Sequence, residues 1–341
     1  MMGSRYLVLG LALVAATGCR PANVETAPGL SLRCINLSDS AVTWDRPSET
    51  RRDLDRWCSV VGPPAVLSSP ANTRQEIGRL VVLSWNVHVG GARIEPLVDL
   101  IRQRTRELGG ETGIVLLLQE AFRGGRAVGD LPAVVEVPAS IRPHRPADDV
   151  VQVAGKLGLS AFYVPSMRNG RSTSLYEQED RGTAILSTEP LGDFKAIELP
   201  FGRQRRVAIM ATVTPRNTTG GSIRVVSAHF DVVLFGSRAV RQAEHLASRI
   251  RELNPEGLPV IVGADANSLR GLGHGTVGAI ASVVPVLRRC GTGRTAAWLR
   301  RLDFLFSDLP ESSISHCETL QDRYGSDHRP ILMRMDYQPP E

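Results

Sequence analysis

Most of the chain consists of short apolar runs separated by stretches in which apolar and polar residues alternate with helical spacing. This pattern begins near Leu80 and continues to the C-terminus. It is typical of a layered α/β fold. Each apolar run is predicted to form a β-strand, and the runs span residues 80–86, 114–119, 161–164, 183–187, 207–213, 223–229, 259–263, 302–306 and 331–335.

Helices are predicted between several of these strands. The clearest covers residues 237–253, where Ser237 is a suitable N-cap. Its apolar residues recur at helical spacing and share one face: Val240, Ala243, Ala247 and Ile250. Weaker patterns predict helices over residues 94–107 and 150–157. The elements are therefore expected to alternate between strand and helix along the chain.

The first residues have the pattern of an export signal. Arg5 precedes an apolar stretch over residues 6–17, which is shorter than the ~20 residues that a spanning helix requires. The segment from Ala16 to Cys19 is similar to a bacterial lipobox, in which Cys19 is lipidated and becomes the first mature residue. Ordinary cleavage and release is the alternative. The protein is expected to be exported, either as a membrane-anchored lipoprotein or as a periplasmic or extracellular protein.

Cysteine usage is consistent with export. Apart from Cys19, the chain contains four cysteines, an even number that suits an oxidising compartment. Their neighbourhood in sequence favours the disulfides Cys34–Cys58 and Cys290–Cys317, although other pairings remain open. No cysteine lies in a C-x-x-C or histidine-rich setting, so a zinc site is not expected.

The chain is expected to contain one large domain behind its leader. Residues 1–19 form the signal peptide, and residues 20–78 form an extension rich in Pro, Ser and Arg that a disulfide stabilises. The α/β domain follows over residues 79–338. Within it, residues 123–148 have the Pro and Gly content of a long loop. Loops of this length in compact domains are often functional.

Composition narrows the class of protein. Apolar residues make up 42% and charged residues 22%, which is close to the globular average and excludes disordered and fibrous classes. The net charge of +5 suits an anionic substrate without requiring one. All the basic residues except Lys156 and Lys195 are arginine, and they are scattered. Aromatic residues make up only 5%, which argues against a base-stacking platform for single-stranded nucleic acid.

Polar residues that could bind a metal ion or act as acids and bases recur at the ends of the predicted strands. Alone, each is more often a turn residue than a ligand. Together they offer an amide, several carboxylates and two imidazoles, which suits a hard cation and acid–base chemistry. The set comprises Asn86, Glu120, His229, Asp231, Asp265, Asn267, Asp303, Asp327 and His328. Strand ends in layered α/β proteins are where such sites are usually built.

Seven segments carry a family resemblance. SWNVH, LLLQEAF, RGTAILS, VVSAHFD, IVGADANS, LDFLF and SDHRP occur in this order. They resemble the endonuclease/exonuclease/phosphatase superfamily over residues 80–336. The resemblance implies a DNase I-like α/β fold, a four-layered sandwich in which two mixed sheets face each other and helices lie outside. It also implies a metal-dependent phosphoester hydrolase.

The resemblance assigns a role to each motif residue. Asn86 and Glu120 match the residues that hold Mg²⁺ or Mn²⁺, and the third candidate ligand is Asp327, with Asp265 as the alternative. Asp265 matches the residue that orients or deprotonates the attacking water. The remaining assignments concern phosphate and the closing histidine: His229 binds phosphate, Asn267 binds phosphate and positions the nucleophile, Asp303 orients His328, and Asp327 and His328 form the closing pair. Both histidines are expected to be cationic.

Other polar residues have two interpretations. His88 stands where some relatives have an acid, and it either contacts the phosphate or the water at the metal site, or fills space. Arg181 either contacts substrate phosphate or is a solvated charge at a strand end. The run of Arg203, Arg205 and Arg206 is expected to form a solvated turn, and the alternative is that it lies at a substrate groove.

The leading hypothesis is an exported phosphodiesterase or phosphatase that uses Mg²⁺ or Mn²⁺ and in-line attack by an activated water. Its substrate is expected to be a nucleic acid, a phospholipid or a small phosphodiester. A nonspecific DNase-type endonuclease is an alternative, and a catalytically inactive surface protein that binds phosphorylated ligands is another. The protein is expected to be monomeric and attached to the membrane through its lipid.

Overall fold

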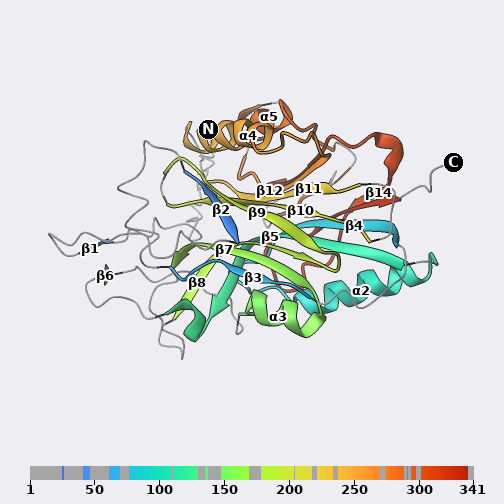
Figure 1. The fold of residues 1–341 in the computed structure, drawn as a ribbon, viewed down its shortest axis with the longest axis horizontal. Helices are drawn as coiled ribbons and strands as arrows, with labels where there is room; N and C mark the ends of the chain where they lie inside the picture. The colour runs from blue at the N-terminus through green and yellow to red at the C-terminus, as the bar shows by residue number, and fades with distance from the viewer. Residues whose placement is uncertain are drawn as a thin grey trace, which may run out of the picture.

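The structure is a computed structural model. It describes residues 25–26, 41–46, 61–69, 77–109, 111–129, 135–136, 147–168, 178–202, 204–216, 221–232, 237–268, 274–287, 290, 293–296 and 301–336. Within these ranges, two large mixed sheets lie face to face with helices on both outer sides (Figure 1). This is the α/β sandwich that the sequence predicts.

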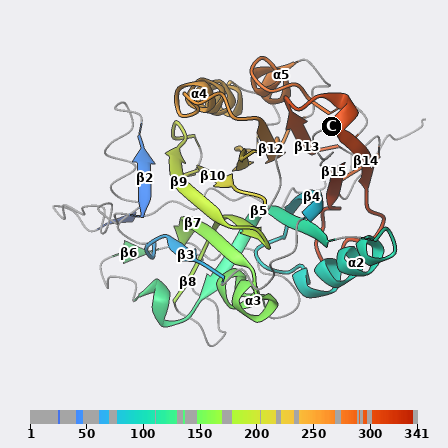
Figure 2. The same cartoon turned by 45° about the vertical axis from the view of Figure 1, so that its right-hand side comes forward.

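One sheet has six strands. Its spatial order is β13 (Asp303–Ser307), β12 (Val260–Asp265), β11 (Ile223–His229), β10 (Val207–Val213), β9 (Leu191–Glu198) and β2 (Val42–Asp45). The pairs β11–β12 and β2–β9 are parallel, and the others are antiparallel. Helices α4 (Arg238–Glu252) and α5 (Gly275–Ala281) cover its outer face (Figure 2).

The other sheet has seven strands. Its order is β14 (Ile314–Thr319), β15 (Ile331–Asp336), β4 (Ile77–Asn86), β5 (Glu111–Gly124), β8 (Glu179–Ser187), β7 (Ser160–Arg168) and β3 (Ala65–Leu67). Helices α2 (Ile94–Arg106) and α3 (Val150–Leu157) pack on its outer face. Two short strands, β1 (Glu25–Thr26) and β6 (Val135–Glu136), pair with each other outside both sheets.

The core is built in layers. One apolar cluster fills the space between the two sheets, and one lies under each pair of helices. A few polar contacts join the sheets: Ser227 donates a hydrogen bond to the Leu118 carbonyl at 3.0 Å and accepts one from Gln119 at 3.1 Å. Because these side chains are buried and hydrogen-bonded, they fix how the ends of β5 and β11 face each other.

Most predicted elements are present, with shifted ends. Strands β10 and β11 have the predicted bounds, and so does α3. Strand β5 runs from Glu111 to Gly124, well beyond the predicted 114–119, and β7 runs on to Arg168. Ser237 is the N-cap of α4, but its side chain makes no capping hydrogen bond.

The extension contributes a strand to each sheet. Strand β2 pairs with β9, and β3 pairs with β7. Asp45 at the end of β2 forms an ion pair with Arg249 of α4 at 2.6 Å, so the strand is also tied to a helix. Near the other end of the chain, the disulfide Cys290–Cys317 joins a loop to β14. Cys19, Cys34 and Cys58 lie outside the described residues.

No helix within the described ranges combines the length and hydropathy needed to cross a membrane.

Candidate active site

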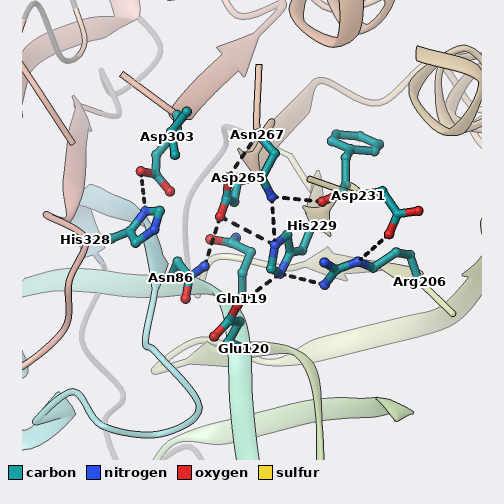
Figure 3. Close-up of polar contacts among 12 residues, drawn as sticks. Asn86, Gln119, Glu120, Arg206, His229, Asp231, Asp265, Asn267, Asp303 and His328 are labelled. Carbon is teal, nitrogen blue, oxygen red and sulfur yellow. Dashed lines mark hydrogen bonds and ion pairs between the residues drawn. The ribbon is translucent and has the colours of Figure 1, made fainter. Parts of the chain in front are cut away.

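The strand ends of the two sheets bring the motif residues together (Figure 3). In the six-stranded sheet, His229 pairs in register with Asp265, and Asp265 pairs with Asp303. In the seven-stranded sheet, Asn86 pairs in register with Gln119. Glu120 is therefore next to Asn86 along the sheet edge, facing the other three residues.

Glu120 is redirected by a β-bulge. The pairing of β5 with β8 shifts register between Leu118 and Ala121, and Glu120 has a φ of 52°. Bulges of this kind change the direction of a side chain and are common beside active sites. The Glu120 side chain is 21% exposed, and its carboxylate lies 3.9 Å from His229 Nδ1. The bulge therefore aims a carboxylate into the space between the sheets.

Asn86 connects the sheets at the floor of the site. Its Nδ2 donates a hydrogen bond to Asp265 Oδ2 at 2.9 Å, and its Oδ1 accepts one from the His88 backbone at 3.0 Å. Ser326 donates to the Asn86 carbonyl at 2.6 Å and accepts from the His328 backbone at 3.0 Å. These bonds fix the end of β4 to the segment that carries His328.

Asp265 is a buried carboxylate with an unusual charge state. Besides the bond from Asn86, its Oδ1 accepts a hydrogen bond from the Asn267 backbone at 3.1 Å. Burial, together with the negative charge of Asp303, raises the pKa of Asp265 to about 7. The carboxylate is therefore able to accept a proton near neutral pH.

His328 and Asp303 form a buried ion pair. His328 Nδ1 donates to Asp303 Oδ2 at 2.7 Å, and Thr295 Oγ1 accepts a hydrogen bond from the Asp303 backbone at 3.1 Å. Burial opposes the charge on His328, but the Asp303 carboxylate outweighs it and raises the pKa of His328 to about 10. His328 is therefore cationic at neutral pH, as the sequence predicts.

His229 was also expected to be cationic, but its surroundings oppose a positive charge on its ring. Its Nδ1 lies 3.0 Å from Arg206 Nη1, and its Nε2 lies 3.0 Å from Asn267 Nδ2. Burial holds the pKa of His229 well below its ordinary value, and the positive charges of Arg206 and His328 act in the same direction. The prediction that both histidines are cationic is thus wrong for His229, because the ring is buried and a cation already lies against it.

Three remaining predicted residues lie around this centre. Arg181 lines a small cavity together with Glu120, Arg206 and His229. Asp327 is 49% exposed, with its carboxylate 3.9 Å from His88 Nδ1 and 4.0 Å from His328 Nε2. His88 has a φ of 48°, a left-handed conformation that is uncommon outside glycine and clusters at functional sites.

The predicted solvated turn is wrong for two of its arginines. Arg205 is buried and paired with Glu198 at 2.6 Å, and Arg206 is buried and paired with Asp231 at 3.3 Å. Arg203 lies outside the described residues. Sequence reasoning therefore missed Arg206 as a neighbour of His229. Its position directly before the apolar β10 was the available signal.

Two groups of donors in the site suit a metal ion. Asp265, Asp303 and His328 place their ligand atoms within 4.8 Å of one another. His328 Nδ1 already donates to Asp303 Oδ2 at 2.7 Å, so a cation held by this group would have to displace that proton. Glu120 fits better: in the described part of the chain its carboxylate accepts no hydrogen bond, and Asn86 Oδ1 keeps a free lone pair. These oxygens suit a hard cation such as Mg²⁺.

The fold is a sandwich of two sheets, and one edge of it gathers carboxylates, an amide and two histidines. This combination defines a hydrolase-type site of the DNase I-like class. The sequence comparison agrees, because residues 83–328 match the model of the Endonuclease/Exonuclease/phosphatase family. The chain belongs to this family. No protein with a curated description matches the sequence.

Solved structures share the fold at low identity. An endonuclease/exonuclease/phosphatase from Beutenbergia cavernae is 18% identical, with a TM-score of 0.52, over 76% of this chain and 72% of that one. A family protein from Leptotrichia buccalis is 15% identical, with a TM-score of 0.51, over 76% and 100%. The catalytic domain of human Nocturnin, with bound sulfate, is 16% identical, with a TM-score of 0.50, over 77% and 96%.

Proposed function

We propose that this protein is a divalent-metal-dependent phosphoester hydrolase that uses in-line attack by an activated water. One observation carries the proposal. Strand ends from both sheets place a buried carboxylate with a pKa of about 7, Asp265, between a cationic histidine, His328, and an amide, Asn86. Neighbouring acidic and basic groups whose pKa values are both displaced from their ordinary values are typical of acid–base sites.

Asp265 is the group that removes the proton from water. Its position between Asn86 and Asn267 fixes the direction of its lone pairs, and its burial keeps it basic enough to accept a proton. The cationic His328, held by Asp303, lies where negative charge develops on the phosphoryl oxygens. Asn267 and His229 supply further N–H groups on the same side.

Asn86 and Glu120 are proposed as the residues that hold Mg²⁺ or Mn²⁺. When bound, the cation supplies charge to the phosphoryl oxygens and favours in-line displacement. Glu120 gives the anionic ligand, and Asn86 gives a neutral oxygen from the neighbouring strand β4. Asp327 is exposed beside His88 and is proposed as a contact to water or substrate at the mouth of the site.

Hydrolysis of bis-p-nitrophenyl phosphate tests this proposal. The mature protein is expected to hydrolyse it with Mg²⁺ or Mn²⁺ and to lose the activity in chelator. Asp265→Asn should lower the rate by about 10²–10⁴-fold. Asp308→Asn is the matched control, because Asp308 binds the first residue of β12, at the end remote from Asp265. Equal rates for the wild type and Asp265→Asn would refute the assignment.

The substrate class can be determined by comparing the activity on different substrates directly. A phosphodiesterase or phosphatase acting on a small ester or lipid and a DNase-type endonuclease share the same chemistry. A panel of plasmid DNA, sphingomyelin, phosphoinositides and nucleotides separates them. Activity on none of these, together with phosphate-ligand binding, would favour the inactive surface protein instead. The complete set of acids and histidines favours an enzyme.

Export is part of the same proposal. It rests on residues 1–19, with Cys19 as the lipidated first residue of the mature protein. Mass spectrometry of the protein from the membrane fraction of a bacterial host is expected to find a lipid-modified Cys19. An unmodified N-terminus downstream of Cys19, in released protein, would contradict the anchor.

A further inference from the structure

A chain of buried polar side chains runs from helix α4 to the active site. Gln242 of α4 accepts a hydrogen bond from the Asp231 backbone at 2.9 Å and donates one to the Pro200 carbonyl at 3.0 Å. The Asp231 carboxylate accepts from Arg206 Nε at 3.3 Å. Arg206 Nη1 then lies 3.0 Å from His229 Nδ1 (Figure 3). The path therefore ends on a ring nitrogen of the active site.

The surroundings hold Arg206 in place. Arg206 and Asp231 are both buried, and their ion pair at 3.3 Å places a carboxylate against the guanidinium. Gly202 covers the carboxylate closely, because a Cβ at that position would overlap Asp231 Oδ2. The guanidinium is thus fixed on the far side of His229 from Asp265, with little freedom to move away.

Two donors compete for the single acceptor nitrogen of a neutral imidazole. Arg206 faces Nδ1, and Asn267 Nδ2 faces Nε2, each at 3.0 Å. The Asn267 amide is held in this orientation because Nδ2 also donates to the Phe230 carbonyl at 2.9 Å. A guanidinium cannot lose its proton, and a charged donor makes the stronger bond. Nδ1 therefore accepts from Arg206, and the ring proton is on Nε2.

We propose that Arg206, held by Asp231, is a positioning residue that fixes His229 as the neutral tautomer with its proton on Nε2. With the proton on Nε2, His229 presents an N–H donor beside Asp265, whose Oδ2 lies 3.5 Å from Nε2, and Asn267 Nδ2 keeps its bond to the Phe230 carbonyl. A phosphoryl oxygen beside the attacking water can accept a hydrogen bond from this Nε2–H. This inference rests on the proposed function, since it concerns the same site.

Arg206 could also contact the substrate directly, and the test must distinguish this role from the positioning of His229. Its Nη2 atom is buried without a hydrogen-bond partner among the described residues, and the side chain lines the cavity that Glu120 and Arg181 also line. Direct contact with the substrate phosphate is therefore the rival account. A direct contact would change substrate binding, whereas a positioning residue changes the imidazole and the chemical step.

The first experiment reads the tautomer in the unmutated protein. ¹⁵N NMR of the mature protein, with the His229 signals assigned by their loss in His229→Asn, is expected to show an unprotonated Nδ1 and a protonated Nε2. A proton on Nδ1 would overturn the proposal. This readout needs no activity, so it remains decisive even if the protein fails to hydrolyse any phosphoester.

The second experiment uses matched variants. Arg206→Leu should move the His229 proton and lower kcat on bis-p-nitrophenyl phosphate by about 100-fold, with KM almost unchanged. Asp231→Asn should have the same effect to a smaller degree. Arg205→Leu is the control, because it also leaves a buried carboxylate, Glu198, without its partner but lies away from His229.

Two results would contradict this account of Arg206. A raised KM with an unchanged tautomer in Arg206→Leu would assign the residue to direct substrate contact. An equal loss of kcat in Arg205→Leu would assign the effect to general destabilisation. A tautomer change confined to the Arg206 and Asp231 variants supports the positioning role.

Discussion

Neighbouring residues of the site hold opposite charges because their surroundings differ. Asp265 is buried beside a second acid, which raises its pKa to about 7. His328 is almost as buried but is bonded to Asp303 at 2.7 Å, which raises its pKa to about 10. At neutral pH the site therefore presents a weakly basic carboxylate next to an imidazolium. This division follows from the position of Asp303 and requires no bound ligand.

The charge state of Asp265 predicts how stability depends on pH in the protein without metal. In the unfolded chain this acid loses its proton near pH 4, whereas in the folded protein it keeps it until about pH 7. The unfolded state binds fewer protons over this interval, so the contribution of Asp265 to stability falls as the pH rises. An asparagine at this position has no proton to lose in this pH range, so the Asp265→Asn variant should not show this fall in stability.

Thermal unfolding in chelator, followed from pH 4 to pH 8, checks this prediction. The melting temperature of Asp265→Asn should rise relative to wild type by several degrees across the interval and then level off. A difference between the two proteins that stays constant with pH would show that Asp265 ionises normally.

The ion pair of His328 gives another prediction. In Asp303→Asn the pKa of His328 should fall from about 10, because burial then loses its main opposition and only the charges of Asp265 and Asp327 still raise it. The rate of phosphoester hydrolysis should fall by about 10²–10⁴-fold at neutral pH. NMR titration of the His328 ring follows the first effect independently of the second. A His328 that still titrates near pH 10 would contradict the assignment.

The positions of the site residues were predictable where a polar residue stands at the end of an apolar run. Asn86, Glu120, His229, Asp265 and His328 each follow or adjoin an apolar run, so their sequence position gives their place in the fold. Arg206 was harder to predict, because three charges near a turn normally indicate a solvated segment, and its position directly before β10 was the one opposing signal. Its burial depends on Asp231 and Gln242, which approach it only in the folded protein.

At the scale of elements, strands with a continuous apolar run were predictable, and strands rich in polar residues were not. Strands β10 and β11 are buried on both faces and appear as continuous apolar runs. Strand β14 lies at a sheet edge with exposed residues, and β9 carries polar residues over its first half. Helix α5 contains two glycines, which weaken the helical signal. The bulge at Glu120 also has no readable sequence code.

The disulfide connects one such edge to the site. Cys290 and Cys317 are separated by 27 residues, and the loop between them includes Asp303. Cys290→Ser should therefore lower the free energy of unfolding by about 3 kcal/mol, chiefly by freeing the unfolded chain. Urea unfolding of Cys290→Ser, Cys317→Ser and the double variant checks this. The double variant should be no less stable than either single one, and wild-type stability in all three would refute the bond.

At the scale of the whole molecule, the family motifs predicted the sandwich because they are spread over both sheets. The contribution of the extension was not predicted: β2 and β3 are each the edge strand of a sheet, and neither has a long apolar run. Packing against β9, β7 and α4 stabilises them. Sequence periodicity cannot show such pairings, since each strand has only three or four residues.

The central claim is that strand ends from both sheets form one pocket for a divalent cation and a phosphoester. A crystal structure of the mature protein with Mn²⁺ and a slowly hydrolysed phosphodiester tests it most directly. The anomalous signal of Mn²⁺ is expected beside Glu120 and Asn86, with the phosphate between the cation and His229, Asn267 and His328. Mn²⁺ bound elsewhere, with the phosphate remote from Asp265, would contradict the account.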